Sequence, residues 1–358
     1  MESQQDGLVI DPVTGFYVRT AGNAIELAGQ AVAHLYGRTH LSHIVSSGMN
    51  AIMLTFMSLK QHIFSQLQPP QEKESRPVVI MGDELYCDTD QHVVHWLSDA
   101  GFEVVRTDPS DYEMTLGFIE LHKTRLVAVF FESCSNPSGK VTDWRVLKSI
   151  KEPTWIVIDN TWLSPVIVNP FLYGANVVLE SGTKYLSGGQ FIIGQITTCS
   201  SDHPSEKLIT YHKRLLGIHV SPIYCRQLVI QLQSLPERVA RAVHRAKDFL
   251  SLVDKRVEVC YSGTPDSKFA SGIVLLKVQI TNPKLKTSKW KSYVITAIES
   301  SGIKAETSYG KPYDSICNWV QRSRDKESIQ LRLAFGYGRE IIDVSTLFSN
   351  VECILQNI

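Results

Sequence analysis

The chain has 358 residues, of which 43% are hydrophobic, and its 36 basic residues balance 36 acidic ones. This composition is typical of a globular protein that is long enough for one large domain and a smaller one. Because the basic side chains show no excess, the sequence does not favour binding to nucleic acid or to an acidic membrane surface.

The seven cysteines are scattered, odd in number and without a C-x-x-C pair. This pattern indicates neither a disulfide framework nor a metal site. The first seven residues are polar and lack the apolar segment of a signal peptide, and the longest apolar stretches are too short to cross a bilayer. We therefore expect a soluble protein of the reducing cytoplasm.

Along the chain, the first 22 residues are polar and interrupted by Pro12, Gly15 and Gly22, which predicts an extended arm, and a helical pattern follows to about Tyr36. Another helix begins in the segment 48–54. Up to about residue 200, helical stretches alternate with short apolar runs at 78–81, 102–107, 126–133, 154–159, 176–181 and 195–200. Short apolar runs of this kind are typical of a mostly parallel sheet that is covered on both faces.

Beyond about residue 226 the pattern changes. A charged helix over 236–253 leads into strands near 257–261, 272–280 and 329–336. This predicts a smaller α+β domain that is joined to the first by a helix. We expect an arm with the first helix over 1–36, a large α/β domain over 37–225 and a C-terminal α+β domain over 226–358.

Polar groups with a shared chemistry follow two of the predicted strands. Asp159 ends one strand, and Ser181, Thr183 and Lys184 follow the next. Ligands of open α/β sheets bind at the carboxyl ends of strands. A lysine flanked by hydroxyls, with an acid nearby, is what pyridoxal phosphate (PLP) requires. The amine forms a Schiff base, the acid keeps the pyridine nitrogen protonated and the hydroxyls bind the phosphate. Taken alone, such a lysine is more often a surface residue.

The surrounding motif narrows this choice. Asp159-Asn160-Thr161, Pro165, Gly174-Ala175, Val178 and Ser181-x-Thr183-Lys184-Tyr185 follow one another at fixed spacing. This segment resembles the Cys/Met-metabolism PLP family of cystathionine γ-synthases, cystathionine lyases and methionine γ-lyases. The resemblance implies the type I PLP-dependent transferase fold, with a mostly parallel central sheet between helices and a smaller α+β C-terminal domain.

Other segments resemble parts of that family which hold the cofactor. Ser47-Gly48-Met49 opens a helix whose free amides suit the phosphate. Tyr86 matches the tyrosine that stacks on the pyridine ring and is a candidate for proton transfer at the leaving group. Asn136, in the segment 132–137, matches the asparagine that contacts both the cofactor and the substrate carboxylate.

The resemblance also implies substrate-binding residues and an assembly. Arg332 matches the arginine that binds the substrate α-carboxylate through two parallel hydrogen bonds. Ser300-x-Gly302 matches the S-L-G loop beside that carboxylate, and Glu299 stands where a residue faces the substrate side chain. Tyr17 and Arg19 match an arm that enters the phosphate site of a neighbouring subunit, which implies a homodimer or homotetramer.

The chain departs from the family pattern where the substrate side chain would lie: Cys134 replaces a proline, and the family's T-x-x-H loop before the final strands is missing. Elsewhere, Ala334 follows Arg332-Leu333 in place of serine. The reaction therefore stays open. We expect β- or γ-elimination on an amino acid, with Lys184 as the general base. One alternative is γ-replacement, which joins a nucleophile to an activated homoserine. The other is a non-catalytic PLP-binding partner protein, against which the set Lys184, Asp159 and Arg332 argues.

Overall fold

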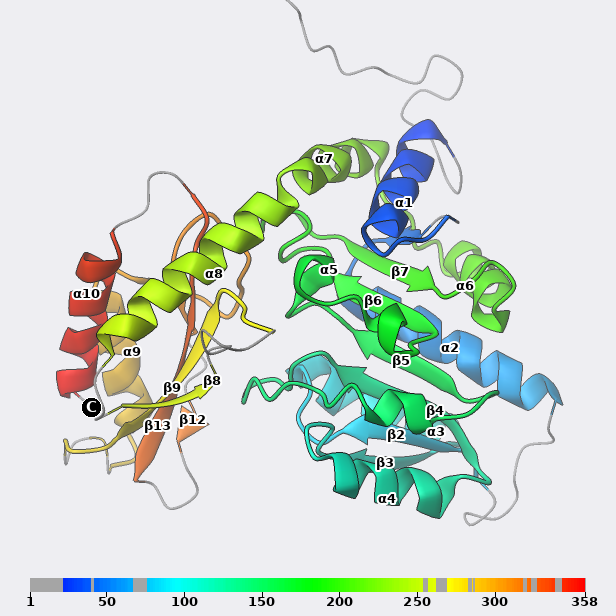
Figure 1. The fold of residues 1–358 in the computed structure, drawn as a ribbon, viewed down its shortest axis with the longest axis horizontal. Helices are drawn as coiled ribbons and strands as arrows, with labels where there is room; N and C mark the ends of the chain where they lie inside the picture. Colours follow the sequence, from blue (N-terminus) through cyan, green and yellow to red (C-terminus); the bar gives the residue numbers. More distant parts are fainter. Residues whose placement is uncertain are drawn as a thin grey trace, which may run out of the picture.

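The computed structural model describes residues 22–39, 42–66, 76–253, 257–261, 269–282, 285, 287–317, 321–322, 327–338 and 343–357. These residues form a large α/β unit and a smaller unit with its own sheet, joined by the long helix α8 (Leu235–Leu252) (Figure 1). The expected arm with Tyr17 and Arg19 lies outside the described residues. No helix in these ranges is long and apolar enough to span a membrane.

The large sheet has seven strands in the order β1-β7-β6-β5-β4-β2-β3. Their bounds are β1 (His43–Val45), β2 (Val78–Gly82), β3 (Glu103–Thr107), β4 (Leu126–Glu132), β5 (Trp155–Asp159), β6 (Val177–Ser181) and β7 (Gly194–Thr198). β7 runs antiparallel to both of its neighbours, β1 and β6, and all the other strand pairs are parallel. The short connection after β6 contains no crossover helix, and a parallel strand would require one.

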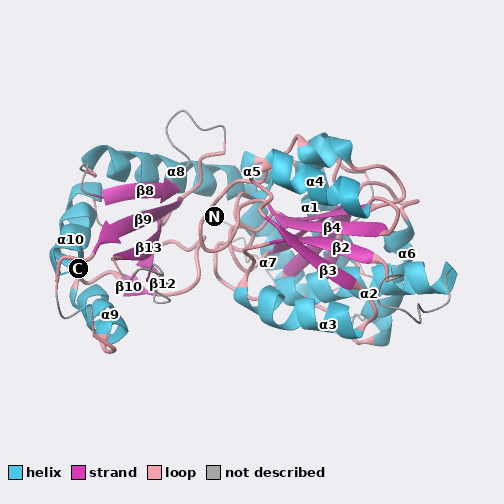
Figure 2. Cartoon of the chain, turned by 90° about the horizontal axis from the view of Figure 1, so that it is seen from below, coloured by secondary structure: helices cyan, strands magenta, loops and turns pink. Residues whose placement is uncertain are grey.

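Helices cover both faces of this sheet, which explains why its inner strands β2, β4 and β5 are largely apolar (Figure 2). One face packs against α1, α4 and α7, and the other against α2, α3 and α6. The helices of this unit are α1 (Asn23–Leu35), α2 (Gly48–Gln66), α3 (Val94–Asp99), α4 (Tyr112–His122), the short α5 (Ser164–Ile167), α6 (Pro204–Leu215) and α7 (Pro222–Gln233). Alternate residues of β4 enter opposite cores: Val129 and Phe131 one, Ala128 and Phe130 the other.

The smaller sheet is mainly antiparallel, in the order β10-β11-β13-β9-β8, with β12 paired to β13. Its strands are β8 (Val257–Tyr261), β9 (Ile273–Gln279), β10 (Lys304–Ala305), β11 (Ser315–Ile316), β12 (Gln321–Arg322) and β13 (Ser328–Ala334). A third core lies between this sheet and α8, α9 (Trp290–Ser300) and α10 (Val344–Asn357).

The fold class expected from the sequence is confirmed. The apolar runs coincide with β2 to β7, β8, β9 and β13, and the two helical starts with α1 and α2. The short strands β1, β10, β11 and β12 and the helices α9 and α10 are additions that the sequence pattern did not predict.

Candidate active site

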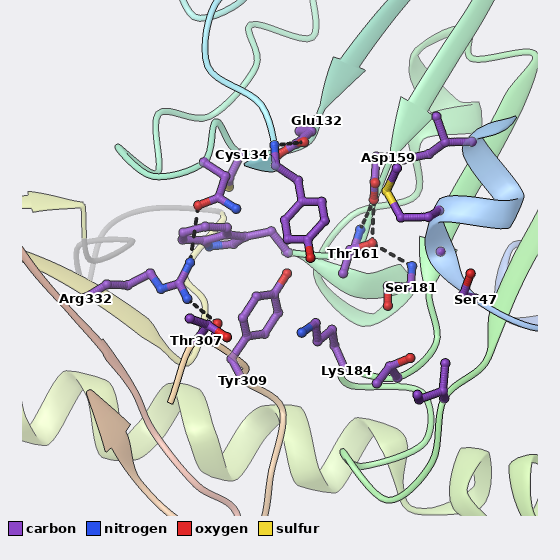
Figure 3. A pocket seen from close by; sticks show the side chains of 18 residues that line it. Ser47, Glu132, Cys134, Asp159, Thr161, Ser181, Lys184, Thr307, Tyr309 and Arg332 are labelled. Carbon is purple, nitrogen blue, oxygen red and sulfur yellow. Dashed lines mark hydrogen bonds between the residues drawn. The ribbon is translucent and has the colours of Figure 1, made fainter. Parts of the chain in front are cut away.

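A cavity of about 260 Å³ opens at the carboxyl ends of β4, β5 and β6, where the large unit faces the smaller one (Figure 3). Its walls come from both units. The lining residues are Ser47, Gly48, Met49, Ile52, Tyr86, Glu132, Cys134, Asn136, Asp159, Thr161, Trp162, Ser181, Thr183, Lys184, Ile192, Thr307, Tyr309 and Arg332.

Lys184 follows β6 and points its amine into the cavity (Figure 3). Its Nζ donates a hydrogen bond to Ser308 Oγ at 2.9 Å. Burial, followed by the positive charges of Arg332 and Lys311, lowers the pKa of the amine to about 8. A substantial fraction of the amine is therefore neutral near neutral pH, as a nucleophile or a general base requires.

The loop that carries Lys184 is held by the second unit. Arg238 on α8 donates to the Tyr185 carbonyl at 2.6 Å, and the Tyr337 hydroxyl donates to the Gly188 carbonyl at 2.9 Å. Gly310 passes so close that a Cβ there would lie 2.7 Å from the Lys184 carbonyl carbon, and its φ of 73° favours glycine. These contacts fix the lysine relative to the smaller unit.

Asp159 ends β5 with its carboxylate at the cavity wall. Its Oδ1 accepts hydrogen bonds from the Thr161 amide at 2.9 Å and the Thr161 hydroxyl at 2.5 Å. The same hydroxyl oxygen accepts from the Ser181 amide at 2.8 Å, which links the ends of β5 and β6. Burial nevertheless raises the pKa of the Asp159 carboxyl to about 6.

A second carboxyl, Glu132, lies opposite Asp159 on the neighbouring strand. Burial and the nearby Asp159 raise the pKa of Glu132 well above its usual range. Its Oε1 accepts the backbone amide of Tyr86 at 2.6 Å, which positions that residue at the cavity rim. Because two adjacent buried carboxyls resist double ionisation, Asp159 is the one that carries the negative charge at neutral pH.

The start of α2 forms the far wall. The Ser47 hydroxyl accepts a hydrogen bond from the Asn50 backbone amide at 3.1 Å. The first backbone amides of α2 have no hydrogen-bond partner within the helix. A Cβ at Gly48 would lie 2.7 Å from that of Ser181, so only glycine permits this approach. The free amides and the Ser181 hydroxyl suit an anion. The Thr183 hydroxyl instead exchanges hydrogen bonds with the backbone of Ile193.

Arg332 enters the cavity from β13 and is buried. Its guanidinium Nη1 donates a hydrogen bond to Asn136 Oδ1 at 3.2 Å, and Nη2 donates one to the Thr307 carbonyl oxygen at 2.5 Å. The guanidinium carbon lies 5.7 Å from the Trp162 ring centre and 5.8 Å from that of Tyr309. Arginine in this setting suits a carboxylate.

The structure brings most of the sequence-predicted site residues together at this cavity. Tyr86, which lines it, remains 40% exposed, and burial followed by the charge of Asp88 raises the pKa of its phenol to about 12. Glu299 and Ser300 are not brought there: they end α9, are exposed and do not line the cavity.

The loop that does reach the cavity contains Ser308-Tyr309-Gly310, a second S-x-G sequence eight residues further on. Sequence reasoning missed Tyr309 and Trp162 as lining residues. The repeated S-x-G pattern could have indicated Tyr309. Trp162 could have been found because it directly follows Thr161 in the motif.

These groups fit PLP: a lysine amine with a lowered pKa, a buried carboxylate, a helix start with free amides and an arginine share one cavity.

Solved structures of other proteins share the fold of this chain. A cystathionine gamma synthase from Xanthomonas oryzae pv. oryzae aligns over 95% of this chain and 87% of its own, with a TM-score of 0.76 and 20% identity. A methionine gamma lyase from Micromonospora echinospora aligns with a TM-score of 0.75 and 21% identity, over 95% of this chain and 88% of its own. The fold is thus that of type I PLP-dependent enzymes, and the cavity offers the groups that would hold PLP.

Sequence comparison is more specific. The model of the family described as Cys/Met metabolism PLP-dependent enzyme matches residues 4–274, and the chain belongs to this family. The family resemblance, the cofactor and the fold type expected from the sequence are thereby confirmed.

Two curated relatives indicate the range of the family. A cystathionine beta-lyase from Schizosaccharomyces pombe is 28% identical over 258 residues, 70% of this chain and 61% of that protein. An L-methionine gamma-lyase from Pseudomonas putida is 26% identical over 270 residues, 75% of this chain and 64% of that protein. The matched part thus spans less than two thirds of either relative.

Proposed function

We propose that this protein cleaves a C–S or related C–X bond of an amino acid by PLP-dependent β- or γ-elimination. The observation that carries the proposal is the meeting of Lys184, Asp159 and Arg332 at one cavity. The names of the relatives, cystathionine beta-lyase and L-methionine gamma-lyase, support elimination as the reaction. The position of the broken bond, β or γ, is open in this proposal.

In this proposal, each part of the cofactor has its own place in the cavity. Lys184 would hold its aldehyde carbon, Asp159 its ring nitrogen, and the start of α2 with Ser181 its phosphate. Tyr86, whose backbone Glu132 fixes, would lie against the ring. When bound, PLP supplies an electron sink for the charge that develops at the substrate α-carbon.

The remaining steps depend on the chain's own side chains. Arg332 would bind the α-carboxylate, because Asn136 and Thr307 already orient its guanidinium. Lys184, when not bonded to the cofactor, would take the α-proton, and its lowered pKa supports this role. A protonated phenol, with Tyr86 as the candidate, would assist the leaving group.

We further infer that the active form is a homodimer or homotetramer, with Tyr17 and Arg19 of one subunit serving the phosphate site of the next. The helices α1 and α7 pack together and expose apolar side chains, including Leu27, Tyr224 and Ile230. Ile192, at the cavity, is 67% exposed. Such a surface suits a second copy of the chain. A cytoplasmic location stays a prediction.

Subunit mixing tests the assembly. Arg19→Ala spoils the arm and Lys184→Ala spoils the site, so each homo-oligomer should be inactive. A mixed dimer pairs one intact arm with one intact site and should recover part of the activity. If fully active protein is monomeric by light scattering, or if proven subunit exchange restores nothing, the arm does not act in trans.

Product analysis tests the reaction. The protein is incubated with PLP and with cysteine, methionine, cystathionine or O-acetylhomoserine plus a thiol. Elimination releases ammonia and an α-keto acid, whereas replacement yields a coupled amino acid without ammonia. Lys184→Ala is the matched control. Coupled product alone would overturn elimination in favour of replacement, and no product with any substrate would favour a binding protein.

A further inference from the structure

Tyr309 is a second phenol in the cavity, and the mechanism above gives it no role. It lies on the loop between β10 and β11 and enters from the smaller unit, with its hydroxyl directed into the cavity (Figure 3). Its side chain is almost fully buried. Trp162 and Tyr185 pack against its ring, each with a centre-to-centre distance of 5.7 Å, so the ring is held in place.

The position of the ring relates it to the substrate. Lys184 Nζ lies 5.3 Å from the ring centre and the Arg332 guanidinium carbon 5.8 Å from it. These two groups are expected to meet the α-carbon and the α-carboxylate of the substrate. A side chain between them faces the substrate itself, whereas Asp159 and the start of α2 face the cofactor.

The hydroxyl of Tyr309 is available as a donor. No described residue forms a hydrogen bond with it, and its pKa is displaced only by burial and by surrounding charges. Burial, followed by the negative charge of Asp159, raises that pKa well above the usual range, so the phenol stays protonated at working pH. A hydroxyl without a protein partner, on a buried ring and open to a cavity, is a strong site for an acceptor on a ligand.

We propose that Tyr309 contacts the substrate and donates a hydrogen bond from its hydroxyl to the heteroatom that leaves in the elimination, as a second donor beside Tyr86, the candidate for proton transfer. This inference rests on the proposed function. As the C–S bond breaks, the sulfur keeps the electron pair and becomes negatively charged. A fixed donor stabilises that charge more than it stabilises the neutral thioether, and the barrier falls. The phenol need not lose its proton in this role.

The test compares leaving groups in wild type and Tyr309→Phe, which keeps the ring and its packing. The substrates are S-methylcysteine and 3-chloroalanine if the enzyme is a β-lyase, or methionine and 2-amino-4-chlorobutyrate if it is a γ-lyase. Chloride leaves readily and accepts hydrogen bonds weakly. We expect kcat/KM for the thioether to fall at least about tenfold and that for the chloride to change less than about threefold.

The matched control is Tyr313→Phe. Tyr313 lies on the same loop, but its hydroxyl donates to Glu306 and accepts from Lys311 at 2.8 and 3.1 Å, outside the cavity. This variant should retain wild-type rates with both substrates. Bound PLP and its visible spectrum should be the same in all three proteins.

An equal loss with both substrates would show that the phenol supports packing or alignment and would overturn the proposal, as would no loss with either. If wild type itself turns over neither substrate of either pair, the proposed elimination fails, and the role of Tyr309 fails with it. The wild-type rates therefore separate the two failures.

Discussion

The two sides of the cavity differ in how the chain builds them. On the sheet side, Asp159 and Ser181 end paired parallel strands, and Thr161 links them by hydrogen bonds. On the other side, Tyr309 lies on a loop between two-residue strands and Arg332 on β13 of a separate sheet. We expect the rigid sheet edge to hold the cofactor and the loop side to select the substrate. We therefore predict that mutations on the sheet side and on the loop side affect cofactor binding and substrate binding separately.

The largest expected effect is on the sheet side, at Lys184. Lys184→Ala should abolish turnover and the visible absorption of lysine-bound cofactor, because no other lysine lines the cavity among the described residues. Absorption spectroscopy and an assay of α-keto acid provide the measurement. Lys213→Met is a matched control, since Lys213 is also buried and has a pKa lowered by burial but lies on α6. A Lys184 variant that keeps both signals would contradict the assignment.

The next effect separates two neighbouring carboxyls. Asp159→Asn should retain PLP but lose about 3 kcal/mol or more of barrier stabilisation, because an amide does not hold the pyridinium by charge. Glu132→Gln should cost only a few-fold in kcat, because burial and Asp159 already favour the neutral form of Glu132. Steady-state kinetics at a fixed PLP content tests both. Equal losses in the two variants would remove the distinction.

On the substrate side, Arg332→Lys keeps the charge and loses the two parallel hydrogen bonds. We expect KM to rise about tenfold or more while bound PLP stays unchanged. This outcome would sharpen the division between the two sides. A fall in PLP content together with substrate affinity would instead show that Arg332 supports the fold of the site.

The smallest effect concerns proton binding at Lys184 in PLP-free protein. Its pKa is lowered to about 8, so the neutral, reactive fraction of the amine rises gradually with pH and reaches half at about pH 8. Lys140 provides the contrast, because its hydrogen bond to Asp108 raises its pKa. Brief acetylation at several pH values, followed by peptide mass spectrometry, should show Lys184 reaching its plateau at a lower pH than Lys140. The reverse order would contradict the environment described for Lys184.

The sequence predicted the sheet side far better than the loop side. Asp159 ends β5 and Lys184 follows the neighbouring strand β6, so the segment between them has a fixed length. The motif therefore contains many recognisable residues within one continuous segment. Apolar runs predicted β2, β4 and β5 because these strands are buried on both faces. Ser47 reached the site as expected, since it lies where α2 begins at the same sheet edge, whereas Glu132, at the end of β4, was not predicted as a site residue.

The loop side contains little local information. An S-x-G triplet occurs at Ser300 and again at Ser308, and the triplet alone does not distinguish the end of α9 from the loop at the cavity. Only tertiary packing distinguishes the two positions. Gly310 packs against the backbone of Lys184, and Ser308 Oγ accepts a hydrogen bond from the Lys184 amine. The hydrogen bond from Arg238 to the Tyr185 carbonyl likewise joins residues that are far apart in sequence.

The most direct test of the account locates the cofactor. The purified protein with bound PLP is reduced with borohydride, which fixes the cofactor to the lysine that holds it, and is then digested and mapped by mass spectrometry. We predict that the pyridoxyl phosphate mass is found on the peptide containing Lys184 and on no other. Modification of a different lysine, or none in protein saturated with PLP, would contradict it.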